Sequence, residues 1–99
     1  MRVVWTDNAK SDLIQQIRYI AMRDRDAAKR QRSRIHQAVS NLRHTPKIGR
    51  PGSIEGTREL VISGTSYLAV YGIVGNDIEI YHVYHGRQNW QNDADTIAE

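Results

Sequence analysis

Residues 58–84 read RELVISGTSYLAVYGIVGNDIEIYHVY, and this stretch decides the fold. It contains three runs rich in β-branched and aromatic residues, which are typical of β-strands. The runs span residues 58–63, 67–74 and 78–84. Neighbouring runs are separated only by GTS at residues 64–66 and by GND at residues 75–77, and links this short form hairpins. We therefore predict three consecutive antiparallel strands.

The last of these strands shows which side faces the core. Ile78 and Ile80 alternate with Glu79 and Tyr81, so apolar residues lie on one face and polar or amphipathic residues on the other. The pattern shifts between Tyr81 and Val83, where either His82 or Val83 can continue the apolar face. This shift predicts a β-bulge or the end of the strand.

A short strand and a helix are predicted at the beginning of the chain. Residues 2–5 read RVVW, a β-branched and aromatic run that indicates a strand. Thr6 or Asp7 can accept hydrogen bonds from the first free amides of a helix, which is predicted to continue over residues 10–22. Apolar residues recur there at helical spacing, so one face of this helix is expected to lie against the core.

A second helix is predicted after the charged sequence RDRD at residues 23–26. Asp24 or Asp26 is a suitable N-cap, and apolar residues at helical spacing carry the helix to about Leu42. The sequence HTP at residues 44–46 ends it, because proline cannot continue a helix. So few residues separate the two helices that they must form an antiparallel hairpin.

The predicted order of elements is β-α-α-β-β-β, which is an α+β fold. The helical hairpin is expected to cover one face of an antiparallel sheet of about four strands, and the other face stays open to a partner. A chain of 99 residues suits one domain, so residues 1–99 are predicted to form a single domain. Within it, residues 91–99 are predicted to be a loosely ordered acidic tail.

The composition excludes several kinds of chemistry. The chain has no cysteine, which excludes disulfides, thiolate metal sites and a cysteine nucleophile. His82 and His85 lie three apart in a predicted strand, so they point to opposite faces and do not suit joint metal binding. We expect neither a metal nor a cofactor. Neither an export signal nor a run long enough to span a membrane is visible, so we expect a cytoplasmic protein with no membrane partner.

Positive charge is concentrated in the middle of the chain. The whole chain carries a formal charge of +3, whereas residues 23–50 hold nine Lys and Arg against two Asp, a difference of +7. This concentration indicates an acidic partner, either nucleic acid or protein, and a solvated helix face is the alternative.

Three carboxylates on separate elements, those of Asp12, Glu59 and Glu79, are predicted to be ordinary surface charges.

The richest polar cluster directly follows the last predicted strand and reads YHGRQNW at residues 84–90. Loop residues at the end of a rigid sheet commonly bind partners or catalyse reactions. Arg87 can hold phosphates or carboxylates, His85 can exchange protons near neutral pH, and Trp90 can stack on a base or anchor a protein interface. The alternative is that Trp90 covers the core while His85 and Arg87 bond to carbonyl groups.

Four short motifs follow the helical hairpin in a characteristic order. They are GRPG at residues 49–52, GTREL at 56–60, YLAVY at 67–71 and VYHGRQNW at 83–90. Together with the Ala-Ala opening of the second helix, they make the chain resemble the RelE/ParE toxin superfamily, and its ParE-like branch most closely. The resemblance covers residues 2–90. It implies a toxin encoded beside an antitoxin protein, which binds and neutralises it.

Two activities occur in this superfamily. RelE-like members cut messenger RNA on the ribosome without a metal, and ParE-like members block DNA gyrase. Nuclease members often carry a basic residue at the place matching Leu68 and lysines at the places matching residues 59–61, where this chain has Leu and Glu-Leu-Val. If this chain were a nuclease, the resemblance implies that it would have fewer catalytic residues than those members. The candidates are Arg58, Tyr84, His85 and Arg87.

The resemblance therefore favours gyrase inhibition, with the antitoxin and DNA gyrase as partners. The candidate target-binding residues are Arg87, Gln88, Trp90, Lys47 and Arg50. One alternative is a ribosome-dependent mRNA endoribonuclease, whose partners would be the ribosome and mRNA. The other is a relative that has lost its toxicity and only binds the antitoxin. Whether the chain is an enzyme depends on which of these activities it has.

Overall fold

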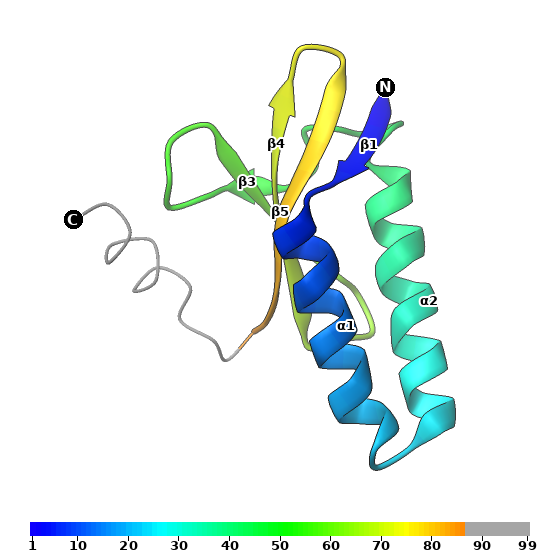
Figure 1. The fold of residues 1–99 in the computed structure, drawn as a ribbon. Helices are drawn as coiled ribbons and strands as arrows, with labels where there is room; N and C mark the ends of the chain where they lie inside the picture. Colours follow the sequence, from blue (N-terminus) through cyan, green and yellow to red (C-terminus); the bar gives the residue numbers. More distant parts are fainter. Residues whose placement is uncertain (87–99) are drawn as a thin grey trace, which may run out of the picture.

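The computed structural model describes residues 1–86 (Figure 1). Its elements are β1 (Arg2–Trp5), α1 (Asp7–Ala21), α2 (Arg25–Asn41), β2 (Arg50–Pro51), β3 (Thr57–Val61), β4 (Tyr67–Val74) and β5 (Asp77–His85). The α+β class and the predicted order are confirmed, with one addition, because the loop after α2 contributes the short strand β2. The predicted acidic tail lies outside the described residues.

The five strands form one sheet in the order β1-β5-β4-β3-β2. The pairs β3–β4 and β4–β5 are antiparallel, as predicted for the two hairpins, and β2 also pairs antiparallel with β3. By contrast, β1 runs parallel to β5, with Arg2 opposite Asp77 and Trp5 opposite Ile80. The sheet is therefore mixed and has five strands, where about four antiparallel strands were predicted. Alternating side chains reveal the faces of a strand but not its direction, so the sequence pattern could not show this pairing.

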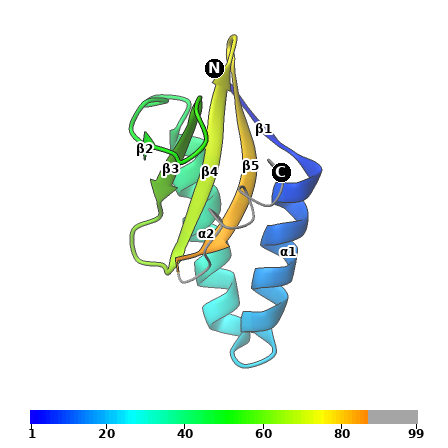
Figure 2. The same ribbon diagram turned by 90° about the vertical axis from the view of Figure 1, so that its left-hand side faces the viewer.

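The two helices form a hairpin on one face of the sheet (Figure 2). Thr6 caps α1 by accepting a hydrogen bond from the amide of Ala9 at 3.2 Å. Asp24 caps α2 by accepting one from the amide of Ala27 at 3.0 Å. Each cap satisfies an amide that has no partner inside the helix. Both caps lie at positions that the sequence predicted.

A β-bulge in β5 keeps the apolar residues of this strand in the core. Val70 pairs with His82 and Tyr71 pairs with Ile80, so Tyr81 has no opposite residue. The extra residue shifts the alternation by one position, and Val83 therefore faces the helices as Ile80 does. Ile80 and Val83 are both completely buried. The bulge predicted between Tyr81 and Val83 is confirmed.

The buried hydroxyl of Tyr71 ties the loop after α2 to the sheet. It donates to the carbonyl of Pro46 at 2.7 Å and accepts from the amide of Gly49 at 2.9 Å. Glycine is needed at position 49, because a Cβ atom there would lie 2.6 Å from this hydroxyl. Arg58 adds a second tie, since its Nη1 donates to the carbonyl of Lys47 at 3.1 Å and to that of Gly49 at 2.8 Å.

Replacing Tyr71 with phenylalanine should destabilise the fold. The change leaves the ring in place but removes the partner of the Gly49 amide and of the Pro46 carbonyl, which costs about 1–3 kcal/mol in the free energy of unfolding. Urea unfolding of the two proteins measures the difference. Tyr19→Phe is the matched control, because Tyr19 is 57% exposed and its change should cost little. Equal losses in both variants would contradict the role of the Tyr71 hydroxyl.

Candidate functional site

The predicted cluster at residues 84–90 begins at the end of β5. Tyr84 and His85 lie in this strand, whereas Arg87, Gln88 and Trp90 lie outside the described residues. His85 faces the helices, with its ring edge-on to that of Tyr67 at a centroid distance of 5.4 Å. Both rings line a hollow of about 590 Å³ beside the end of α1. Tyr84 faces the opposite side of the sheet.

Lys47 and Arg50, two cations predicted to bind the target, and the candidate nuclease residue Arg58 lie in and after the loop that Tyr71 holds. Lys47 is exposed, and Arg58 is partly buried where it bonds to two loop carbonyls. Arg50 pairs through Nε with the Oε1 of Glu59 at 2.9 Å, and the side chain of Glu59 is only 6% exposed. The prediction that Glu59 is an ordinary surface charge is therefore wrong, because Arg50 neutralises a nearly buried carboxylate.

The candidate nuclease residues in the described part are not gathered at one place. Arg58 lies opposite Tyr71 in β4, and His85 lies opposite Tyr67, four residues further along the same strand. Four residues of a strand span about 13 Å. Moreover, Tyr84 and His85 point to opposite faces of the sheet.

The sheet face opposite the helices is apolar at its centre. Leu68, Val70 and Tyr84 form a second apolar cluster, against which Tyr81 packs. Leu68, at the place where nuclease relatives carry a cation, is 8% exposed. Burial, and then the charge of Glu79, raises the pKa of the Tyr81 hydroxyl, so this phenol stays protonated at neutral pH. The three residues of the cluster therefore offer no cation, and Tyr81 offers no phenolate base.

Comparisons with known proteins identify the family of this chain. Residues 3–90 match the model of the family described as "ParE toxin of type II toxin-antitoxin system, parDE". The chain belongs to the ParE toxin family. It is 43% identical over 89 residues to the "Putative toxin Y4kP" of Sinorhizobium fredii (strain NBRC 101917 / NGR234), covering 90% of this chain and 92% of that protein.

A solved structure shows the same fold. A chain of the "Chromosomal ParDE TA system from P. aeruginosa" superposes with a TM-score of 0.79 at 23% sequence identity. The superposition covers 86% of this chain and 95% of the solved one. Membership of the ParE family makes this chain a toxin of a type II toxin–antitoxin system and implies an antitoxin as its partner.

Two further observations concern the described part of this ParE-family chain. Among residues 1–86, no group of three or more His, Asp and Glu side chains is placed to hold a metal ion. Within the same residues, no helix has both the length and the apolar character needed to cross a membrane.

An Asp–His pair that sequence reasoning missed closes the edge of β5 in this ParE-family toxin. Since β1 ends opposite Ile80, no strand within residues 1–86 lies beside the rest of β5 on that side. Thr6 donates through Oγ1 to the Ile80 carbonyl at 2.7 Å. Further along, Asp12 Oδ2 accepts from the amide of Val83 at 3.0 Å and lies 3.0 Å from Nδ1 of His82. Thr6, the N-cap of α1, and Asp12, within this helix, thus bond to the part of β5 that has no described strand beside it.

The prediction that Asp12 is an ordinary surface charge is therefore wrong. Its position next to Leu13 places it at the border of the buried helix face, and this was the only signal in the sequence. The partner His82 lies beside the bulge and stacks on Tyr84, with ring centroids 5.1 Å apart and planes 22° apart. Asp12 holds the His82 ring, and the His82 ring stacks on that of Tyr84, so Asp12 helps to keep the Tyr84 ring in its position.

Replacing Asp12 with alanine should cost about 1–2 kcal/mol in the free energy of unfolding, because the Val83 amide loses its acceptor. Asp12→Asn keeps an oxygen at the same place and should lose less than half as much. Thermal or urea unfolding measures both. Glu55→Ala, in an exposed loop, is the control. The role of Asp12 would be refuted if Asp12→Ala were as stable as this control.

Proposed function

We propose that this ParE-family toxin arrests growth in the cytoplasm by binding and inhibiting DNA gyrase, without cutting RNA. The observation that supports this best is the chemistry of the open sheet face. A metal-independent ribonuclease needs cations around the scissile phosphate, because negative charge develops there in the transition state. The open face instead presents Leu68, Val70 and Tyr84, and the cation beside them, Arg50, is paired with the nearly buried Glu59. A surface whose neighbouring cation is already paired does not supply the group of cations that such a site needs.

The proposed gyrase contacts come from two segments. Arg87, Gln88 and Trp90 follow the end of β5, and arginine and tryptophan are frequent anchors of protein interfaces. Lys47 lies in the loop that precedes β2, and Arg50 lies in this edge strand with its side chain 60% exposed. Only Nε of Arg50 contacts Glu59, so the outer end of its guanidinium group can still reach a partner.

Expression of the chain from a tightly controlled promoter tests this function. The supercoiling of a reporter plasmid and the 5′ ends of translated mRNA are measured in the same cells as growth stops. We expect the plasmid to relax and the mRNA to stay intact. New mRNA ends at codon positions would contradict the proposal and support a ribosome-dependent endoribonuclease. Unchanged growth, plasmid and mRNA would support a non-toxic protein that only binds its antitoxin.

A further inference from the structure

The segment from α2 to the end of the following loop carries positive charge that the proposed gyrase contacts leave largely unused. Residues 27–54 hold seven Lys and Arg and no Asp or Glu. Within residues 1–86, only Arg50 among these seven cations pairs with a carboxylate. A segment whose cations are mostly unpaired attracts an anionic partner.

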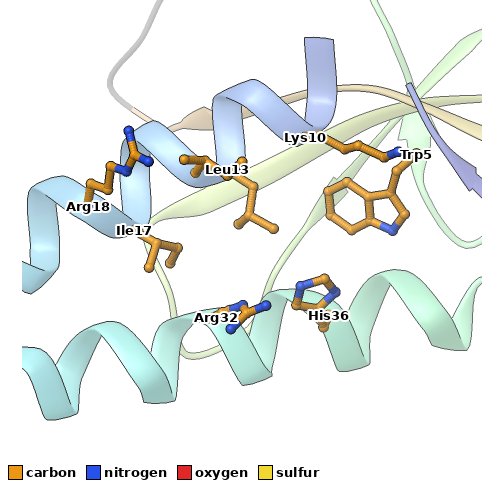
Figure 3. A pocket seen from close by; sticks show the side chains of 8 residues that line it. Trp5, Lys10, Leu13, Ile17, Arg18, Arg32 and His36 are labelled. Carbon is orange, nitrogen blue, oxygen red and sulfur yellow. The ribbon is translucent and has the colours of Figure 1, made fainter. Parts of the chain in front are cut away.

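The cations of α2 lie on two sides of this helix. Arg32 lies on the side toward α1, where it faces the apolar groove between the two helices together with Lys10 and Arg18 (Figure 3). Arg34 is two residues further on, which turns it about 200° around the helix axis. It lines a second groove, of about 340 Å³, between α2 and β3. Arg30 lies four residues before Arg34 and therefore belongs to the same row.

The helix side of this second groove is polar. Its lining from α2 and the following turn comprises Arg34, Gln37, Asn41 and Thr45 among others, and none of its ten described lining residues is a carboxylate. Lys47 is exposed and lies between Thr45 and Ile48, which both line the groove. Side chains of these polar types bond to phosphate and sugar oxygens of nucleic acids. We call this surface the basic edge, and it consists of Arg30, Arg34, Gln37, Asn41 and Lys47.

The guanidinium group of Arg34 is held at the turn between β3 and β4. Gly64 in this turn has a φ of +78°, and a Cβ atom there would collide with Nη1 of Arg34. The guanidinium group therefore packs directly against the backbone of Gly64. A cation that is already held in place loses less side-chain entropy when it binds an anion.

The chemistry of the basic edge favours a nucleic-acid duplex over other anionic partners. Protein interfaces depend on large apolar or aromatic anchors, and none of the exposed large apolar residues of the described chain comes from α2. Ile48 and Val61, which are exposed in the groove, belong to its loop and strand side. Single strands are held through bases that stack on aromatic rings, and residues 25–47 contain no Phe, Tyr or Trp.

The spacing of the row suits the phosphates of a duplex. From Arg30 to Asn41 the row is about 16 Å long, at 1.5 Å per residue. One strand of B-DNA carries a phosphate about every 3.4 Å along its axis, so the row can face about five phosphates. Arg30 and Arg34 are about 6 Å apart along the helix, which corresponds to about two phosphates. The amides of Gln37 and Asn41 can donate to the phosphates that follow.

We infer that the basic edge binds the backbone of duplex DNA without reading its sequence. The residues favour a duplex, and DNA is preferred to RNA because gyrase, the proposed target, works on duplex DNA. To that extent the inference rests on the proposed function. A toxin with this surface holds DNA beside the gyrase that it inhibits, and Lys47 lies where the two binding surfaces meet.

Binding of the complete chain to a fluorescein-labelled DNA duplex of arbitrary sequence is measured by anisotropy at several salt concentrations, with neither gyrase nor antitoxin present. With Arg30, Arg34 and Lys47 on phosphates, the logarithm of the binding constant should fall with the logarithm of the salt concentration at a slope of about −2.7. The double variant Arg30→Gln with Arg34→Gln should reduce this slope to about −0.9 and weaken binding about 30-fold at about 50 mM salt.

Lys10→Gln with Arg18→Gln is the matched control, because it removes the same charge from exposed residues at the other groove. It should weaken binding less than about threefold, since these charges lie away from the bound phosphates. Circular dichroism confirms that each variant is folded. Equal losses in the two double variants would overturn the inference, and so would the absence of any binding by the unmodified chain.

Two further probes test the kind of nucleic acid. Tighter binding to the single strand of the same sequence would contradict the assignment to a duplex, and tighter binding to the corresponding RNA duplex would contradict the assignment to DNA. Failure of the inference and failure of the proposed target give different results. A chain that binds the duplex through the basic edge but leaves gyrase active would refute only the target, whereas a chain that inhibits gyrase without binding the duplex would refute only the inference.

Discussion

Replacing Arg87 and Trp90 together with alanine is expected to abolish growth arrest and to leave the free energy of unfolding unchanged. Both residues follow β5 in the sequence, and this strand ends at His85. If each anchors the gyrase contact, each contributes about 2 kcal/mol. Their combined loss would then weaken binding about 1000-fold, since every 1.4 kcal/mol is a factor of ten. Colony counts under induction, at equal protein abundance by immunoblot, measure the effect.

Arg25→Ala is the control for this pair. Arg25 is an exposed cation at the start of α2, and it is far in the sequence from the proposed gyrase contacts at residues 47–50 and 87–90. It should leave growth arrest intact. If Trp90 instead covers the core, the double variant would unfold more easily and its abundance would fall. Arrest that persisted at equal abundance would remove Arg87 and Trp90 from the mechanism.

Arg50→Ala is expected to have the second large effect. It leaves the Glu59 carboxylate, which is 6% exposed, without its cation. Removing one partner of a fully buried pair costs roughly 3–5 kcal/mol. Here the exposed end of Arg50 lets water reach the pair, so we expect a loss of about 2 kcal/mol in the free energy of unfolding. Urea unfolding of the single variant measures this loss.

The double variant Arg50→Ala with Glu59→Leu separates structure from function. Leucine at position 59 would extend the apolar cluster next to Val70, its opposite residue in β4, and should restore most of the stability. If Arg50 also contacts gyrase, the restored protein still arrests growth less than the unmodified chain. Full recovery of arrest together with stability would limit Arg50 to a structural role. A single variant as stable as the unmodified chain would show that the pair does not stabilise the fold.

The local features of the fold could be predicted because each depends on neighbouring residues. The glycine-containing links, which the structure places at residues 62–66 and 75–76, give hairpins. Thr6 and Asp24 give helix caps, and the shift at Tyr81 gives the bulge. The parallel pairing of β1 with β5 was not predictable in this way. It joins residues about 75 positions apart, and no alternation in either strand encodes a neighbour at that distance.

The same limit applies to the candidate site. The segment after β5 was found because its polar and aromatic residues are contiguous in the sequence. By contrast, the pairings of Asp12 with His82 and of Arg50 with Glu59 depend on how strands and helices meet. A lone carboxylate in the sequence looks the same whether it is solvated or paired. Both were therefore predicted as surface charges, although one completes a sheet edge and the other is nearly buried.

The apolar groove illustrates a third case. Leu13 and Ile17 belong to the helical stripe that the sequence predicted as core, and Leu13 is indeed buried. Of the three cations around them, Lys10 and Arg18 come from α1, and only Arg32 belongs to the excess of charge between residues 23 and 50. Their arrangement around an apolar floor appears once the hairpin is formed.

The central claim, that this ParE-family toxin acts on DNA gyrase, is tested most directly by supercoiling with purified components. Relaxed plasmid, ATP and gyrase are incubated with increasing amounts of the purified chain, and the topoisomers are separated on a gel. We predict that supercoiling falls as the chain approaches the concentration of gyrase, and that prior addition of the antitoxin restores it. Undiminished supercoiling in the presence of excess folded chain would contradict the claim.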